Sequence, residues 1–180
     1  MFEPVNDIDV PAIVALMNRA YRGTGSPAAW NSEAGYIAGD RTSEALVRDD
    51  LRANSDAVLL KWVDAPSAAI VGCVWLEPTD GSTWYLGSLT ADPDRQNEGL
   101  GRRLLEAAER WIADRGGTRV RMTVVSVRDT LIAWYLRRGY RLTGETEPFP
   151  YDDHRFGTPL RDDLEFVVLE KTLMPIAGED

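Results

Sequence analysis

The sequence predicts one α/β domain in which helices flank a mixed, mostly antiparallel sheet. Three strand-like runs follow one another in the first half of the chain, and helix-like and strand-like runs alternate in the second half. The 180 residues with 44% hydrophobic content are enough for one sizeable core but few for two. We therefore assign residues 1–174 to a single domain and residues 175–180 to a frayed C-terminal tail.

The first half is predicted to begin with a short strand at residues 1–5 and two amphipathic helices. The first helix opens at Asp7 or Asp9, with Pro11 in its first turn, and the second covers residues 43–54. A loop at residues 23–32 follows the first helix.

Three strands follow, at residues 57–63, 68–77 and 84–91, with short turn-forming segments between them. Such turns predict antiparallel hairpins. A helix at residues 99–115 then leads to a strand at residues 119–127. Because a helical crossover joins parallel strands, we expect residues 84–91 and 119–127 to form a central parallel pair. A helix at residues 129–138 and strands near residues 140–145 and 164–173 complete the order.

The junction between strand 84–91 and helix 99–115 predicts an anion-binding turn. The first N–H groups of a helix lack intrahelical partners and lie at the positive end of its dipole, and glycine lets a phosphate approach the backbone. The turn reads Gln96-Asn97-Glu98-Gly99-Leu100-Gly101. It has neither the three-glycine dinucleotide fingerprint nor the Lys-Ser/Thr ending of a nucleotide P-loop, so NAD and ATP are not indicated. An ordinary glycine-containing connection is the structural alternative.

Two motifs give the chain a resemblance to a known family. Gln-x-x-Gly-x-Gly followed by Arg102 and Arg103 resembles the acetyl-CoA signature of the GNAT superfamily of N-acetyltransferases, and residues 131–140 are similar to its second signature, an aromatic-Tyr pair before a Gly-aromatic step. The resemblance implies a GNAT-like sheet with a splayed central pair and acetyl-CoA as acyl donor. The coenzyme contacts that it implies are Leu89, Thr90 and Ala91 on the strand and Gln96, Asn97, Glu98, Gly99, Leu100, Gly101, Arg102 and Arg103 at the turn.

The same resemblance implies catalytic roles. Tyr135 matches the tyrosine that protonates the departing thiolate in many family members; its alternative is a core tyrosine with its hydroxyl bound to the backbone. An asparagine often precedes this helix in the family, whereas Arg128 or Asp129 stands here. The strand before the turn lacks the family's glutamate, so Glu77 is the candidate base, directly or through a water, with an exposed turn acid as its alternative.

Two loop regions resemble those of a bacterial GNAT subgroup and are predicted to border the acceptor site. They cover residues 30–42 and 149–159 and supply Trp30, Glu33, Arg41 and Tyr151 as candidate acceptor contacts. The structural alternative is that Trp30 caps a small core and that Glu33 and Arg41 form a surface pair. His154, the sole histidine, is expected to be a surface residue.

Charge and composition exclude several classes of function. A net charge of −9, from 29 acidic and 20 basic residues, would repel nucleic acid; it could attract a cationic amine or simply aid solubility. The single cysteine, Cys73, is expected to be buried and inert, and one cysteine with one histidine predicts no metal site. The acidic residues 1–9 do not fit a signal peptide, and no apolar run has membrane-spanning length. A soluble, cytoplasmic protein, monomeric or homodimeric, is expected.

These features together predict an acyltransferase that moves an acetyl group from acetyl-CoA to a primary amine of a small molecule or peptide. The expected mechanism is direct attack by the amine, with no covalent acyl-enzyme. Two alternatives stay open: an inactive CoA-binding or acyl-CoA-binding sensor, and an enzyme that acetylates a protein N-terminus or lysine.

Overall fold

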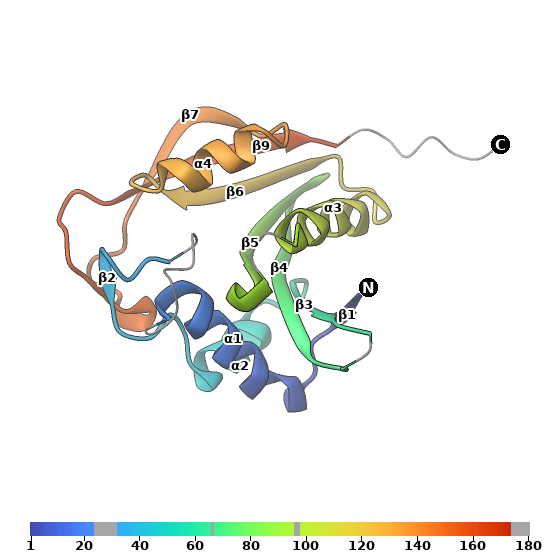
Figure 1. Cartoon of the computed structure of the whole chain (residues 1–180). Helices are drawn as coiled ribbons and strands as arrows, with labels where there is room; N and C mark the ends of the chain where they lie inside the picture. Colours follow the sequence, from blue (N-terminus) through green and yellow to red (C-terminus); the bar gives the residue numbers. More distant parts are fainter. Residues whose placement is uncertain (24–31, 66, 96–97, 174–180) are drawn as a thin grey trace.

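The computed structural model describes residues 1–23, 32–65, 67–95 and 98–173 (Figure 1). Within them, seven strands form one sheet in the order β1-β3-β4-β5-β6-β9-β7, and β2 and β8 form a separate two-stranded sheet. The helices are α1 (Val10–Arg22), α2 (Glu44–Ala53), α3 (Leu100–Ala113) and α4 (Asp129–Leu136). The strands are β1 (Phe2–Pro4), β2 (Ile37–Ala38), β3 (Val58–Val63), β4 (Ile70–Asp80), β5 (Thr83–Ala91), β6 (Arg119–Val125), β7 (Arg141–Pro148), β8 (Thr158–Pro159) and β9 (Glu165–Thr172).

The sheet has the predicted topology. Strands β1, β3, β4 and β5 pair antiparallel, as do β6, β9 and β7, and the parallel pair β5–β6 lies between these two groups. Helix α3 connects the two parallel strands, as a crossover between parallel strands requires. The fold class predicted from the sequence is therefore confirmed.

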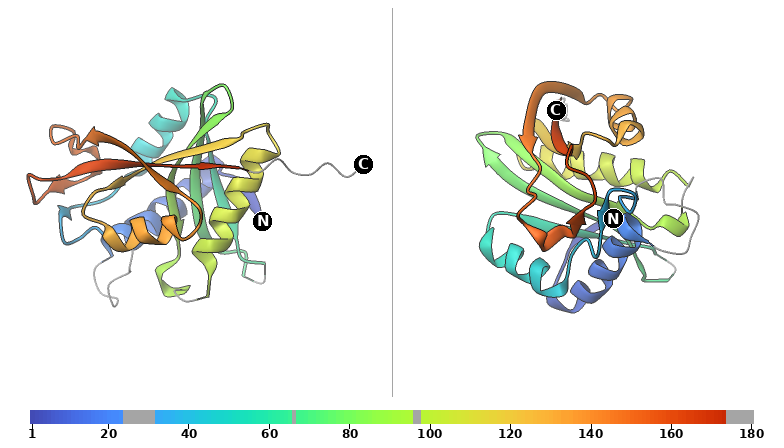
Figure 2. Two further views of the ribbon diagram at one scale, coloured as in Figure 1. Left: turned by 90° about the horizontal axis from the view of Figure 1, so that it is seen from above. Right: turned by 90° about the vertical axis from the view of Figure 1, so that its left-hand side faces the viewer.

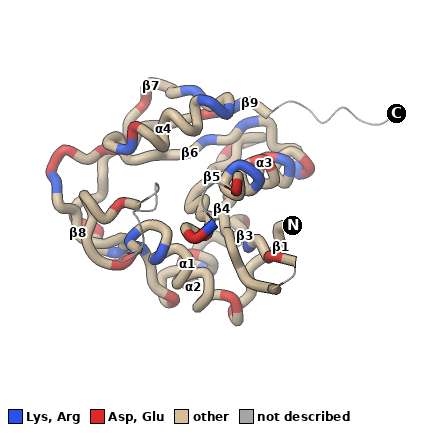
Figure 3. The backbone as a smooth tube through the Cα atoms, viewed as in Figure 1, with Lys and Arg blue, Asp and Glu red and all other residues tan. Residues whose placement is uncertain are grey.

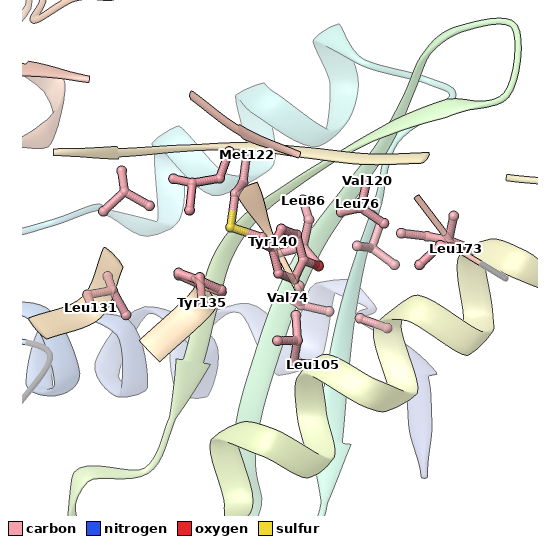
Figure 4. Close-up of a cluster of buried hydrophobic side chains, with 14 of the residues drawn as sticks. Val74, Leu76, Leu86, Leu105, Val120, Met122, Leu131, Tyr135, Tyr140 and Leu173 are labelled. Carbon is pink, nitrogen blue, oxygen red and sulfur yellow. The ribbon is translucent and has the colours of Figure 1, made fainter. Parts of the chain in front are cut away.

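Helices cover both faces of the sheet (Figure 2), and the alternation of side chains along the strands divides the core between these faces. Leu59 and Cys73 point to the face that α1 and α2 cover, whereas their neighbours Leu60 and Val74 point to the face that α3 and α4 cover. The cluster that contains Leu60 and Val74 also includes Leu105 of α3 and both Leu131 and Tyr135 of α4 (Figure 4). Each helix pair thus buries its apolar stripe against one face.

The parallel pair separates soon after it begins. Only Thr83, Trp84 and Tyr85 of β5 pair with β6, although both strands continue beyond them. The pairing of β5 with β4 also shifts between Cys73 and Trp75, and Ser88 has a φ of 49°, which is unusual for a residue with a side chain. The bulge and the early end of pairing leave the edge of β5 that faces β6 without a strand partner beyond Tyr85.

Several local predictions need adjustment. Helix α4 has Arg128 as its N-cap and ends at Leu136 rather than at Arg138, and β7 extends to Pro148 rather than ending near Glu145. The small sheet formed by β2 and β8 was not predicted, because each strand has only two residues and they lie about 120 positions apart in the chain. This pairing brings the two predicted acceptor loops together.

Cys73 has the environment that the sequence predicts. Its side chain is fully buried, and burial raises the pKa of its thiol to about 12. A thiol with so high a pKa supplies almost no thiolate near neutral pH, so Cys73 is a packing residue rather than a nucleophile.

Candidate active site

A cavity of about 400 Å³ opens where β5 and β6 separate. Its walls come from both strands, from α1, α2 and α4, and from the segments on either side of the β2–β8 sheet. The strand edge of Gly87, Ser88 and Leu89 lies along it, and Val124 and Val125 line it from β6. A volume of this size suits a small molecule or part of one.

Tyr135 reaches this cavity from α4. The residue is 6% exposed and lines the cavity, and its hydroxyl has no hydrogen-bond partner among the residues that the structure describes. Its ring packs edge-to-face against Trp134 and Tyr140. Burial raises the pKa of the Tyr135 phenol, and the neighbouring Tyr21 adds to that increase. The phenol therefore stays protonated and available to donate.

Tyr140 differs from Tyr135 in this respect. Its hydroxyl donates to the Glu109 Oε1 atom at 3.0 Å, and Lys171 binds the other oxygen of Glu109 at 2.7 Å. The core-tyrosine alternative thus describes Tyr140, with a carboxylate rather than the backbone as its partner, and not Tyr135.

The three strand residues predicted to contact the coenzyme have different environments. Leu89 lines the cavity, and its carbonyl accepts a hydrogen bond from the Tyr21 hydroxyl at 3.3 Å. Thr90 is fully buried and donates to the Ser88 carbonyl at 2.9 Å, and Ala91 packs beside Leu100 and Leu104 of α3. Backbone atoms are thus what this strand presents to a ligand.

The predicted anion-binding turn lies at the start of α3. Gly99 is the N-cap, with a φ of 70° and no capping side chain, and a Cβ atom built on it would meet nothing within 4 Å. The backbone is therefore open to a phosphate at this point. Glu98 is held by Arg95 at 2.9 Å, and Leu100 is buried against β4 and β5. Gln96 and Asn97 lie outside the described residues.

Basic side chains surround this turn although the whole chain is acidic. Arg102 and Arg103 extend from the first turn of α3 and are exposed, and Figure 3 shows basic residues in blue on this helix. Arg102 and Arg137 both lower the pKa of Arg138 at the end of α4, after the larger effect of burial, so these three cations lie near one another. Sequence patterns pointed to Arg102 and Arg103 but not to the contribution of α4.

Glu77 lies beside the cavity rather than in its lining. Its carboxylate accepts a hydrogen bond from the Trp75 Nε1–H at 3.1 Å, and it stands opposite Tyr85 in the β4–β5 ladder. Trp75 and Tyr85 both line the cavity. A proton from a bound amine would therefore need a water to reach Glu77.

The predicted acceptor residues fall into three groups. Glu33 and Arg41 line the cavity, whereas Tyr151 does not: its hydroxyl accepts from the Leu164 N–H at 2.7 Å and its ring packs on Phe149. Trp30 lies outside the described residues. The surface-pair alternative for Glu33 and Arg41 is wrong, because Glu33 is 6% exposed and pairs with other arginines.

Those arginines are Arg22 of α1 and Arg128 before α4, which were not predicted. Both contact Glu33, Arg128 at 3.2 Å, and Arg22 also donates to the carbonyls of Gly39 and Phe156. The group ties α1 and α4 to the loops that carry β2 and β8. No sequence signal pointed to it, because Glu33 and Arg128 are separated by 95 residues.

Asp50 of α2 is a second cavity residue that the sequence did not indicate. Burial raises the pKa of its carboxyl, while the charges of Arg155 and Arg41 oppose that increase. Within the described part of the chain, no cluster of three or more His, Cys, Asp or Glu side chains is arranged to hold a metal ion. No helix there is long and apolar enough to cross a membrane.

Comparisons with known proteins agree with this geometry. The model of the acetyltransferase (GNAT) family matches residues 16–140. No curated protein matches the sequence significantly.

Solved structures share the fold at low sequence identity. The ribosomal-protein-S18-alanine N-acetyltransferase of Escherichia coli is 16% identical, with a TM-score of 0.65, over 100% of this chain and 97% of that one. A GNAT acetyltransferase of Elizabethkingia anophelis with bound acetyl-CoA is 16% identical, with a TM-score of 0.64, over 96% and 97%. An aminoglycoside 6'-N-acetyltransferase in complex with coenzyme A is 17% identical, with a TM-score of 0.67, over 99% of each chain.

Proposed function

The chain belongs to the GNAT family of acetyltransferases, and from this we propose that it transfers an acetyl group from acetyl-CoA to a primary amine in the cavity between β5 and β6. The observation that carries the proposal is the Tyr135 hydroxyl, which lines the cavity and has no hydrogen-bond partner in the described part of the chain. The Tyr135 hydroxyl oxygen is not among the described polar atoms that the protein seals off, so it is open to a ligand in the cavity.

The residues present fit a coenzyme A moiety. Gly99, Leu100, Gly101 and Arg102 would offer backbone N–H groups to its pyrophosphate, and Arg102 and Arg103 would add positive charge. Gln96, Asn97 and Glu98 complete the proposed turn. The pantetheine arm would lie along the unpaired edge of β5, at Leu89, Thr90 and Ala91, where backbone groups are available to it.

The proposed reaction is a direct displacement. The amine nitrogen forms a bond to the acetyl carbon, the bond from that carbon to sulfur breaks, and the sulfur takes the Tyr135 proton. Because burial raises the pKa of Tyr135, the phenol keeps this proton until the carbon–sulfur bond breaks, and the phenolate that remains recovers a proton from water. No acyl-enzyme is required, which agrees with the inert environment of Cys73.

An alkylammonium must lose a proton before it can attack. We propose Glu77 as the base, acting through a water past Trp75 and Tyr85. Asp50 is a second carboxylate suited to this role, since it lines the cavity and burial raises its pKa toward neutrality.

The alternative function is a sensor that binds CoA without catalysis. Its support is the strand segment Tyr85-Leu86-Gly87-Ser88, which lines the cavity without offering a carboxylate. Acetylation of a protein N-terminus or lysine differs only in the acceptor, and the same cavity would have to admit that side chain or terminus.

Replacing Tyr135 by phenylalanine tests the proposal. Product formation with a panel of amines is followed by thiol release and by the mass of the acetylated amine. Tyr135→Phe should lower kcat by about a hundredfold or more, as expected for loss of a general acid, with little change in acetyl-CoA affinity. Tyr140→Phe is the matched control, because it removes a hydroxyl that Glu109 already binds.

Equal turnover in the wild type and Tyr135→Phe would contradict the assigned role. Tight acetyl-CoA binding without acetylation of any amine in the panel would favour the sensor.

A further inference from the structure

Arg41 is a positively charged residue of the cavity wall, and its charge opposes the rise in the pKa of Asp50 in the same lining. In the described part of the chain it makes no ion pair, in contrast to Arg22 and Arg128, which share Glu33. The guanidinium instead lies between two aromatic rings, 5.3 Å from the centroid of Tyr21 and 4.8 Å from that of Phe156. All three residues line the cavity.

The backbone at Arg41 is held firmly on α1. The Asn18 Oδ1 atom accepts from the N–H groups of Arg41 and Thr42, at 2.8 and 3.0 Å, and its amide donates to the Thr42 carbonyl at 3.0 Å. With its backbone fixed and its side chain between two rings, Arg41 pays little extra entropy when it binds a ligand.

Positive charge predominates on this wall. Three arginines, Arg22, Arg41 and Arg128, lie with one glutamate, Glu33, at this end of the cavity, whereas the other carboxylates of the lining are Asp50, Glu147 and Asp153. A carboxylate is the group that a planar guanidinium binds best, through two parallel hydrogen bonds.

Tyr21 connects this wall to the proposed reaction centre. Its hydroxyl binds the Leu89 carbonyl on the unpaired edge of β5, and its ring contacts Arg41. The guanidinium is therefore about one side-chain length from the strand along which the thioester would lie. A single small molecule could place an amine at the thioester and an anion at Arg41.

We propose that the acceptor is an amine that carries a carboxylate, of the amino-acid class, and that Arg41 binds this carboxylate. This inference rests on the proposed acetyl transfer and specifies its substrate.

Acidic residues at the cavity oppose this assignment only in part. Asp50 and Asp153 also line it, but Arg155 contacts both, at 3.8 and 2.9 Å. Glu147 lines the cavity from the exposed end of β7. These carboxylates would favour a polyamine as the competing substrate class, so polyamines belong in the test.

The test compares acceptors that differ only in the carboxylate. The twenty common L-amino acids, their carboxamides and the polyamine spermidine are assayed for acetyl-CoA-dependent acetylation. An amide lowers the pKa of the amine, to about 8 for a peptide terminus, so deprotonation alone would favour the carboxamides. A preference of about tenfold or more in kcat/KM for the acids would therefore report on carboxylate binding.

Two arginine variants locate the effect. Arg41→Gln should reduce kcat/KM for the preferred amino acid by about ten- to a hundredfold, the range expected for loss of a charged hydrogen bond, and should leave the carboxamide unchanged. Arg115→Gln is the matched control: the Arg115 guanidinium also lies over an aromatic ring, 3.5 Å from the centroid of Trp111, but does not line the cavity, so neither substrate should change.

A binding measurement separates this inference from the proposed function. Calorimetry with the same amino acids in the presence of CoA should show binding that Arg41→Gln weakens. Such binding without acetylation would overturn only the proposed acetyl transfer. Three results would each overturn the role of Arg41. The first is acetylation of carboxamides or spermidine as efficient as that of amino acids, and the second is an equal effect of Arg41→Gln on amino acid and carboxamide. The third is that no amino acid binds.

Discussion

The surroundings of Tyr135 are the basis for its proposed role as general acid. The same α4 segment carries Trp134 and is followed by Tyr140, and all three rings pack together. Only Tyr135 presents a hydroxyl to the cavity, since the Tyr140 hydroxyl is bound to Glu109. Burial raises the pKa of the Tyr135 phenol above its usual value near 10, which favours the protonated form.

The pH dependence of the reaction should reflect this shift. A general acid acts while it is protonated, and the raised pKa of Tyr135 keeps it protonated throughout the range in which an amine deprotonates. We expect kcat/KM to rise with pH as the amine loses its proton and then to level off, with no decline due to Tyr135 below pH about 10. Initial rates at saturating acetyl-CoA, from pH 6 upward, check this.

A decline with an apparent pKa well below 10 that disappears in Tyr135→Phe would contradict the raised pKa of the Tyr135 phenol. The same profile for Tyr140→Phe and the wild type is the control, because the Tyr140 hydroxyl does not line the cavity.

At the scale of elements, the start of α3 is the part of the proposed coenzyme site that depends on backbone shape. Gly99 adopts a φ of 70°, in the left-handed region where a side chain is strained, and the space around it is open. Gly116 follows the other end of the same helix with a φ of 80° and equally open space. The two glycines are thus matched in conformation, but only Gly99 is expected to lie next to a phosphate of the coenzyme.

Replacing each glycine by leucine exploits this match. Gly99→Leu and Gly116→Leu should each lose about 1–2 kcal/mol of stability from the left-handed conformation. Acetyl-CoA should raise the Tm of the wild type and of Gly116→Leu, because a ligand that binds the folded state stabilises it, and should fail to do so for Gly99→Leu. An equal rise in both variants would show that the turn does not hold the coenzyme.

The elements themselves were largely predictable from the sequence. The three-strand run and the crossover helix are local patterns, and each appears close to its predicted position, with Gly99 at the start of that helix. Strands β2 and β8 escaped prediction because two residues show no periodicity, and the N-cap of α4 falls on Arg128 without a capping side chain to mark it.

At the scale of the whole molecule, the candidate site combines residues far apart in the chain. Glu33 lies 11 residues from Arg22 and 95 from Arg128, and Tyr21 lies 68 residues from Leu89. Such contacts follow from tertiary packing and leave no trace in local sequence. Glu33 and Arg41 were predicted from the loop that carries them. Arg22, Arg128 and Asp50 were not predicted, because only tertiary packing brings them to the site.

The molecule as a whole is acidic, yet both proposed binding regions contain arginines. Arg102 and Arg138 lie near the α3 turn, and Arg41 lies in the cavity wall. A net charge of −9 gave no hint of this distribution, because net charge describes no particular surface. Both regions suit negatively charged groups: the phosphates of a coenzyme at one and the carboxylate of an acceptor at the other.

Calorimetric titration of the wild-type protein with acetyl-CoA tests the central claim most directly. The turn at α3 and the separated strands β5 and β6 predict one site per chain, with a Kd on the order of 1 µM to 1 mM, the range typical of enzyme substrates. Absence of binding at acetyl-CoA concentrations of about 1 mM would contradict the proposed coenzyme site and the acetyl transfer that depends on it.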